Sequence, residues 1–309
     1  MSNPNYELRT VDPVLTTLAQ GYVNKKYVAN YLFPIVEVNK SKGRIPVFGK
    51  SAFLERSTER AMGSRSNRIP TTEFELIEFE TQERDVEMAI DYLEEEQTND
   101  FYKYEHYTTQ QLCDILELNR ELEAAKIATN PANYPTQNRI ILDQSSALNY
   151  GGSANDIIKE AISRIRNSIG VRPNTMLISY STYNAILEDI NLNDKLKYSG
   201  ITTLNTKILV DFFEIPTVKV ASSVFSPEGV TFENIWGNTM ILAYVDDSEP
   251  SNRNEFNPSF GYTLRRRGMP EIDTYYENGG KIKVIRNTDN YCIKITSPQA
   301  ACLVANTII

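Results

Sequence analysis

The chain has 309 residues, of which 41% are hydrophobic and 23% are charged, and its formal net charge is -8 at pH 7. This composition is typical of a globular, soluble protein. The acidic balance argues against a dedicated nucleic-acid-binding protein, which needs a basic face, although it permits a place beside nucleic acid. A chain of this length exceeds what one hydrophobic core usually supports, so we expect two domains or a divided core.

The cysteines and the apolar segments indicate the compartment. The three cysteines form an odd set without the spacing of a metal site, which indicates reduced thiols in a cytosolic protein. The first residues contain no basic segment followed by an apolar one, so we expect no signal peptide. The longest apolar run, residues 240–245, is too short to cross a bilayer. We therefore expect no membrane partner.

The first 41 residues are predicted to form an arm with one short helix. Asp12 suits the N-cap of this helix, Pro13 suits its first turn, and Gly21 suits its end. Residues 35–38 and 45–48 are predicted to be short strands on either side of a polar turn. The arm has too few apolar residues to fold alone.

Residues 42–92 are predicted to form an extended loop built as a β-hairpin. From residue 74 to residue 90 apolar residues alternate with polar ones, and the phase switches at Leu76 and Ile77, which indicates a bulge or a twist. A loop of this length is usually functional. Because a two-stranded arm is marginally stable alone in water, we expect this one to lie on another surface.

The charge of this loop changes sign along its length. Residues 42–68 contain seven basic and two acidic residues, whereas residues 73–100 contain twelve acidic residues and one arginine. One interpretation is a solvated face. The other is pairing between copies, in which a basic tip meets the acidic base of the next copy, since heterologous contacts of this kind close rings or shells. The candidate residues are Arg56, Arg60, Arg65 and Arg68 at the tip, and Glu75, Glu78, Glu80 and Glu83 at the base.

Residues 98–130 are predicted to form one helix about 45 Å long, at about 1.5 Å per residue. Its apolar face is predicted to contain Leu112, Ile115, Leu116, Leu122 and Ala125. Its solvent face is predicted to contain Glu121, Glu123 and Lys126. Such a helix exceeds the usual globular length, and no second heptad segment can pair with it. We therefore predict a beam laid across a thin body.

Residues 151–262 are predicted to form an α/β unit with its own core. Isoleucines recur at amphipathic spacing between residues 157 and 169, ahead of a stop at Gly170. A second helix is expected at 181–189, and strands are expected at 175–179, 208–210, 217–220 and 240–245. Strands resume at 262–264, 281–285 and 291–295, with turns at 278–280 and 287–290.

We find no motif for catalysis, a cofactor or a metal. Residues 43–51 resemble a phosphate-binding loop, but five residues instead of four separate the glycines, and no helix is expected after them. His106 is the only histidine and has no cysteine close to it in sequence. Asp246, Asp247 and Glu249 lack the spacing and the turn glycine of a calcium loop. We therefore predict a protein that is not an enzyme and that binds no cofactor and no metal.

Three consecutive arginines, Arg265, Arg266 and Arg267, end a predicted strand. They can guard an edge strand against unwanted pairing. Alternatively, they can contact carboxylates of another subunit, which arginine binds bidentately. The sequence leaves both interpretations open.

Three segments form a pattern because of their order in the chain. The first joins Tyr31-Leu32-Phe33-Pro34-Ile35-Val36-Glu37-Val38 to the stretch from Gly43 to Phe48. The second joins Arg172-Pro173-Asn174-Thr175-Met176 to Asp194-Lys195-Leu196-Lys197-Tyr198-Ser199, and the third runs from Phe260 to Gly268. In this order they resemble the major capsid proteins of tailed bacteriophages.

The resemblance implies the Hong Kong 97-type capsid fold, which is of the α+β class. Its expected parts are an N-terminal arm (1–41), an extended β-hairpin loop (42–92), a peripheral domain (93–150 and 263–309) with a spine helix (98–130), and an α/β axial domain (151–262).

The implied function is that of a major capsid protein, which self-assembles into pentamers and hexamers of an icosahedral shell. The shell would enclose double-stranded DNA without sequence-specific binding, in a virion assembled in the host cytoplasm. Portal and decoration proteins are further expected partners, and the short arm before Phe33 implies that scaffolding, if the shell needs it, is a separate protein. Some members join neighbours covalently through a lysine and an asparagine, but neither Lys42 nor Lys50 can be assigned that role.

Two alternatives stay open at this point. One is an encapsulin-like shell protein of a bacterial compartment that encloses cargo. The other is a soluble α/β enzyme centred on residues 151–262.

Overall fold

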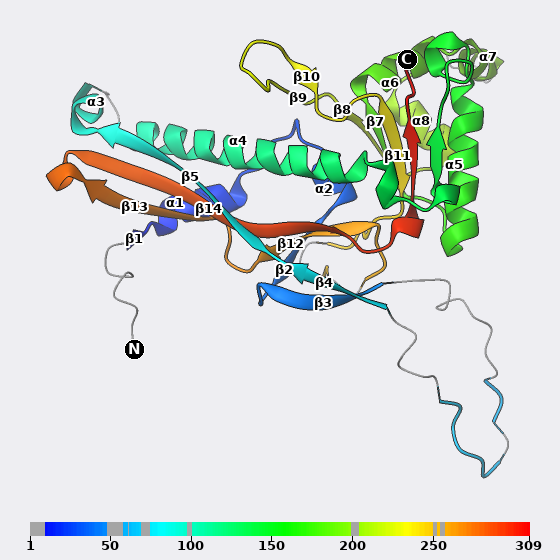
Figure 1. Cartoon of the computed structure of the whole chain (residues 1–309), viewed down its shortest axis with the longest axis horizontal. Helices are drawn as coiled ribbons and strands as arrows, with labels where there is room; N and C mark the ends of the chain where they lie inside the picture. Colours follow the sequence, from blue (N-terminus) through cyan, green and yellow to red (C-terminus); the bar gives the residue numbers. More distant parts are fainter. Residues whose placement is uncertain are drawn as a thin grey trace.

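The computed structural model describes residues 10–47, 58–60, 62–68, 75–97, 101–198, 204–249, 252–253 and 257–309. Figure 1 shows an elongated molecule in which one long helix runs along a sheet toward an α/β unit. None of the described helices is long and apolar enough to span a membrane. Within these ranges, no three His, Cys, Asp or Glu side chains gather closely enough to hold a metal ion.

The first sheet has six strands. They are β1 (Thr10–Val11), β2 (Ile35–Val38), β5 (Gln82–Asp91), β12 (Gly261–Arg266), β13 (Glu271–Glu277) and β14 (Ile282–Ile295). The order is β1-β13-β14-β12-β2, and β5 also pairs with β14. The pairs are antiparallel apart from β12 with β2. Strand β14 pairs with β5, β12 and β13, so it joins the second quarter of the chain to its end, while β1 and β2 from the start of the chain pair with β13 and β12.

The predicted long helix is confirmed as α4 (Phe101–Ala128), a helix of 28 residues that follows α3 (Tyr92–Gln97). It packs against β5, β14, α1 (Pro13–Gly21) and α2 (Ala29–Leu32). Its buried face contains Leu112, Cys113, Leu116, Arg120, Glu121, Ala124, Ala125 and Ala128.

Two expectations about the faces of α4 are wrong. Ile115 is 41% exposed, although it was placed on the apolar face, and Glu121 is 1% exposed, although it was placed in solvent. The helix packs on the sheet in one part and on α2 in another. Because its partners change along its length, the buried face is not the straight stripe that a single helical repeat predicts.

The second sheet has five strands in the order β6-β15-β11-β7-β8. They are β6 (Arg139–Ile141), β7 (Thr175–Ser179), β8 (Thr217–Ala221), β11 (Thr239–Ala243) and β15 (Ala301–Ala305). The helices of this unit are α5 (Ala154–Ile169), α6 (Tyr180–Glu188), α7 (Ile190–Tyr198) and α8 (Thr206–Phe213). Strands β6 and β15 complete this sheet although they lie outside residues 151–262.

Helix α5 begins and ends as the sequence predicts. The Ser153 hydroxyl accepts from the backbone N–H of Asp156, and Gly170 takes the left-handed conformation, with a φ of 76°, that ends the helix. Short 3-10 turns cover Pro131–Asn133, Thr136–Asn138, Leu148–Tyr150, Asn278–Gly280 and Pro298–Ala300.

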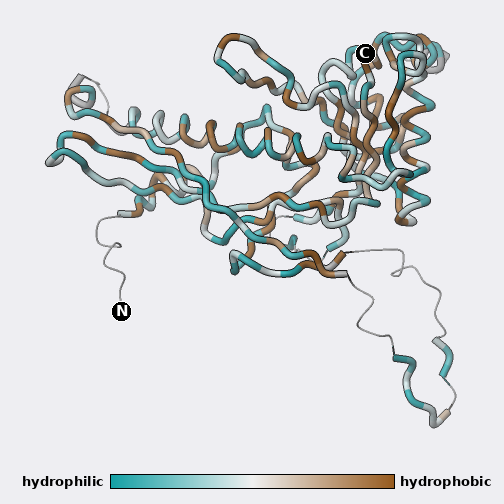
Figure 2. Tube along the Cα trace, viewed as in Figure 1, coloured by the Kyte–Doolittle hydropathy of each residue, from teal (hydrophilic) through white to brown (hydrophobic). Residues whose placement is uncertain are grey.

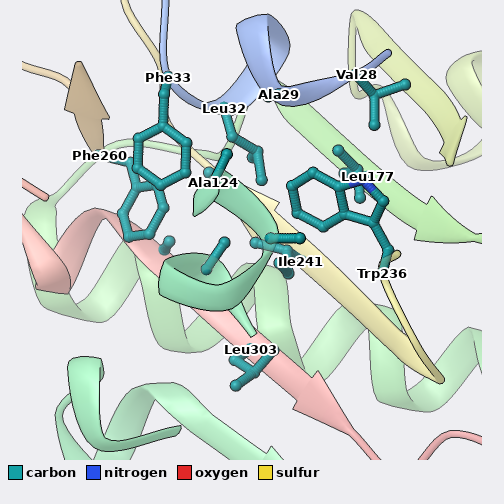
Figure 3. Packing of buried hydrophobic residues seen from close by; sticks show 14 of the residues in the cluster. Val28, Ala29, Leu32, Phe33, Ala124, Leu177, Trp236, Ile241, Phe260 and Leu303 are labelled. Carbon is teal, nitrogen blue, oxygen red and sulfur yellow. The ribbon is translucent and has the colours of Figure 1, made fainter. Parts of the chain in front are cut away.

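The two sheets share one hydrophobic cluster instead of having wholly separate cores. Phe33 from the arm packs against Phe260, with ring centroids 5.4 Å apart, and Tyr134 also stacks on Phe260, with ring centroids 5.7 Å apart. Leu177 and Leu303 of the second sheet belong to the same cluster (Figure 3). Burying a side chain of this size contributes about 1.5–3 kcal/mol, so the cluster fixes the α/β unit against the sheet and the arm.

Two hairpins extend from this body. The larger pairs β3 (Lys42–Val47) with β4 (Glu75–Glu80), and the smaller pairs β9 (Val224–Phe225) with β10 (Glu233–Asn234). Ile45 and Phe79 bury the base of the larger hairpin against β2, β12 and β14. Residues 58–60 and 62–68, near its far end, lie away from the body in Figure 1 and are exposed.

Three local predictions are corrected. Residues 208–210 belong to helix α8, whose first turn is capped by the side chain of Asn205, and they do not form a strand. Residues 287–290 lie inside β14 and do not form a turn, because their polar side chains are buried. The pairing of β3 with β4 runs without a bulge through Leu76 and Ile77, and the strand is interrupted at Thr81 instead.

Candidate assembly surfaces

The basic tip is defined here as residues 58–60 and 62–68. Arg60, Arg65 and Arg68 are exposed, and the Met62 side chain is fully exposed between them. The Arg60 guanidinium donates to the backbone carbonyl of Ser64 at 2.7 Å, which folds the tip locally. The fourth predicted arginine, Arg56, lies outside the described residues.

The acidic base of the same loop is largely engaged within its own hairpin. Glu78 accepts from Arg44 at 2.7 Å, and Glu80 pairs with Lys42 at 2.7 Å. These pairs join directly opposed residues of β3 and β4. Exposed pairs of this kind contribute little, about 0–1 kcal/mol, but they occupy the carboxylates that a partner would need. Glu83 is exposed, and the side chain of Glu75 lies outside the described part.

The three arginines at the end of β12 have different environments. The Arg265 guanidinium donates to the Asp289 carboxylate at 2.7 Å; Asp289 is buried, and the Arg265 side chain is only 14% exposed. Burial lowers the pKa of Arg265, and the Asp289 charge opposes that shift. Arg266 and Arg267 are exposed, and Arg267 lies 3.7 Å from Glu37. Only Arg266 and Arg267 therefore stand at the surface of the subunit.

The edge-guard interpretation of these arginines is wrong for the strand itself. Strand β12 lies between β14 and β2, so it has partners on both sides. Strand β2 belongs to the arm, far from β12 in the chain. Its parallel pairing with β12 therefore cannot be recognised from the sequence of either strand alone.

A buried carboxylate that the sequence analysis placed in solvent connects three distant segments. Glu121 of α4 accepts hydrogen bonds from the backbone N–H groups of Val28, at 3.0 Å, and Ala29, at 2.8 Å, at the start of α2. It also accepts from the Trp236 indole at 2.7 Å and the Ser223 hydroxyl at 3.5 Å. Burial raises the pKa of Glu121, while these donors stabilise the carboxylate and oppose the rise.

This carboxylate therefore ties the arm and the base of the β9–β10 hairpin to the long helix. In the sequence it is one of several glutamates on α4, and no local signal distinguishes it from Glu123, which is only partly buried. The donors that identify it lie about 90 and 115 residues away.

Comparison with known proteins identifies a relative by sequence. No family model matches the chain. The chain is 36% identical over 303 residues to the major capsid protein of Burkholderia phage BcepMu, and the match covers 97% of each protein.

Solved structures share the architecture. A phage-related protein from Bordetella bronchiseptica RB50 is 25% identical, with a TM-score of 0.83 over 97% of this chain and 98% of that one. The putative capsid protein of a prophage of E. coli CFT073 has a TM-score of 0.59 at 10% identity, over 96% and 99% of the two chains. A virus-like particle from Pyrococcus furiosus has a TM-score of 0.55 at 12% identity, over 97% and 98%.

Proposed function

Because the chain belongs to the family of phage major capsid proteins, we propose that its copies assemble into pentamers and hexamers that close an icosahedral shell around double-stranded DNA. Its fold is the Hong Kong 97-type capsid fold. The observation that carries the proposal is the 36% identity to a phage major capsid protein across nearly the whole length of both chains. That relationship favours a phage shell over a cargo compartment or a soluble enzyme.

The shape of the subunit supports assembly through many modest contacts. The molecule is elongated, and its larger hairpin extends beyond the body (Figure 1). A standard interface buries about 800 Å² per partner. A subunit that makes several such contacts can form a stable shell even when each contact between two copies is weak. Closed symmetry repeats every contact around the shell, so the weak contacts add up.

The proposed peripheral and axial domains correspond to the two sheets. The first sheet and α4 serve as the peripheral domain, the arm and the loop of residues 42–92 serve as connectors, and the α/β unit serves as the axial domain. We include β6 and β15 in the axial domain, since they pair in its sheet.

The candidate contact residues follow from their exposure. The tip arginines, Arg266, Arg267 and Glu83 are proposed to face other copies. Arg265, Glu78 and Glu80 already have partners within the subunit.

The remaining partners are proposed on the same basis. The net charge of -8 supports packaging of DNA without tight or sequence-specific binding. A separate scaffolding protein, a portal and decoration proteins would act with the shell, which would be assembled in the host cytoplasm and remain in the virion. The proposed role is structural and needs no catalytic step.

Electron microscopy of the purified protein tests this function. We expect closed shells from the wild-type chain. Reversing Arg56, Arg60, Arg65 and Arg68 to glutamate should leave a folded subunit that assembles poorly, while the same four positions changed to lysine, which keeps the charge, should still assemble. Wild-type protein that stays monomeric or dimeric at every concentration would contradict the proposal. Normal shells from the glutamate variant would remove only its electrostatic part.

A further inference from the structure

The β9–β10 hairpin exposes apolar side chains that nothing in its own subunit covers among the described residues. Phe232 is 79% exposed and Val230 is 81% exposed, at the outer end of a hairpin whose strands have two residues each. Figure 2 shows the hydrophobic colour at that end, away from the α/β unit. Clustered exposed apolar side chains mark interaction sites in soluble proteins, and so short a hairpin is marginally stable alone.

The base of this hairpin is nevertheless firmly anchored. Trp236 is fully buried, and its indole donates to the Glu121 carboxylate of α4. The backbone N–H of Ile235 donates to the carbonyl of Ser223 at 3.1 Å, which closes the two ends of the hairpin. The apolar end is therefore held outward on a fixed base, as a contact element must be.

The charge of the hairpin indicates which kind of surface can bind it. Residues 222–237 contain Glu228 and Glu233 and no lysine or arginine, so the segment has a net charge of -2. Both glutamates are exposed beside Val230 and Phe232. The matching surface must combine positive charge with an exposed apolar side chain.

The basic tip has this combination. Residues 58–68 contain three arginines and one glutamate, a net charge of +2, and they include the fully exposed Met62. Of the four glutamates at the acidic base, Glu78 and Glu80 are paired within their own hairpin, and Glu83 is exposed. With two of the four engaged, the acidic base is a weaker acceptor for the tip than its sequence predicts.

The tip and the β9–β10 hairpin lie on opposite sides of the molecule in Figure 1, the tip beyond β3 and β4 and the hairpin on the far side of α4. A contact between them consequently joins two different copies. Because it uses different surfaces on each copy, it is heterologous and can close into a ring.

We propose that the β9–β10 hairpin is the acceptor for the basic tip of a neighbouring copy. Phe232 and Val230 pack against Met62, and Glu228 and Glu233 face the tip arginines. This inference rests on the proposed shell function and names the surface that the function uses.

Charge reversal on both sides tests the electrostatic part. Glu228→Lys with Glu233→Lys, and separately Arg60→Glu, Arg65→Glu and Arg68→Glu, should each lower the yield of shells about tenfold or more, the change expected from roughly 1.4 kcal/mol at one contact. Combining the two sets should restore most of the yield. As a matched control, Asp247→Lys with Glu249→Lys reverses two exposed acidic residues in another loop and should leave the yield within about twofold, since isolated surface charges contribute little. Tryptophan fluorescence of Trp236 verifies that each subunit is folded.

Cross-linking tests proximity without relying on charge. The native cysteines are buried, so a bismaleimide should not join wild-type subunits. A chain with both Met62→Cys and Phe232→Cys should give a ladder of dimers up to hexamers, and neither single variant should give that ladder. Intact shells of the double variant without the ladder, or combined reversals that assemble no better than either set alone, would overturn the inference. A wild-type chain that forms no shells would instead contradict the proposed function itself.

Discussion

Replacing Glu121 with glutamine tests how the buried carboxylate holds the arm and the β9–β10 hairpin on α4. Glutamine has nearly the same shape, but it offers one acceptor oxygen where glutamate offers two. If that oxygen keeps the Val28 N–H and the Trp236 indole, the amide nitrogen of glutamine faces the Ala29 N–H, which donates to the second oxygen at 2.8 Å. A buried donor without an acceptor costs about 1–3 kcal/mol. We expect the free energy of unfolding to fall by that amount.

The assay is urea unfolding of unassembled subunits, followed by the fluorescence of the single tryptophan and by circular dichroism. Glu121→Leu removes both oxygens and should cost about 3 kcal/mol or more, since the backbone and indole donors all lose their acceptor. The control is Glu160→Gln on α5. Glu160 pairs with Arg164 one turn away on an exposed surface, so its loss should cost less than about 0.5 kcal/mol.

The pH dependence of the same measurement adds an independent test. Because burial raises the folded-state pKa of Glu121 above its ordinary value of 4.5, the folded state takes up a proton before the unfolded state does as the pH falls. The wild-type chain therefore gains stability over the glutamine variant on acidification through that window, and loses this gain as the pH rises again. Equal stability of wild type and glutamine variant at every pH would refute the role assigned to Glu121.

Three further predictions concern other sites. Gly261→Ala should destabilise the subunit by about 1–3 kcal/mol, because a Cβ would lie 2.6 Å from the Lys294 carbonyl oxygen; Gly21→Ala, whose Cβ would meet nothing within 4 Å, serves as the control in thermal unfolding. Asp289→Asn should cost about 3–5 kcal/mol, since it leaves the Arg265 guanidinium buried without its charge partner, and titration with urea measures that loss. Burial raises the pKa of the three cysteine thiols to about 11 or 12; at pH 8 we expect no reaction with a maleimide in the folded chain and reaction of all three thiols in urea, so rapid labelling of the native protein would show that a thiol is accessible.

The sequence predicted elements whose signals are local. Helix α4 has many helix-forming residues before Pro131, α1 has Asp12 and Pro13 at its start, and α5 has Ser153 and Gly170 at its ends. Each of these signals acts within a few residues, so a single sequence contains the information needed to recognise it.

The errors arose where distant contacts decide the structure. The polar residues 287–290 read as a turn, but β14 continues through them because Asp289 meets Arg265 and Asn287 donates to the Cys113 thiol of α4 at 3.3 Å. Residues 208–210 read as a strand because of their apolar side chains, yet they lie in α8, whose buried face contains Leu209 and Phe213. Tertiary packing overrides local propensity in both cases.

The candidate contact residues show the same limit. Charge along the chain identified the basic tip, because its arginines are close in sequence. The chain alone could not reveal that Glu78 and Glu80 face Arg44 and Lys42 across the hairpin, or that Arg265 is largely buried, since each depends on strand register. The β9–β10 hairpin was not singled out by the sequence analysis. Val230 and Phe232 are apolar residues in a short segment, and the sequence alone does not show that they are exposed.

A cryo-electron microscopy map of the assembled particle tests the central claim most directly. The account predicts that residues 58–68 of each subunit lie on an adjacent subunit, with Met62 against Phe232 and the tip arginines beside Glu228 and Glu233. A map in which these residues fold back onto their own subunit, and the β9–β10 hairpin faces solvent, would contradict it.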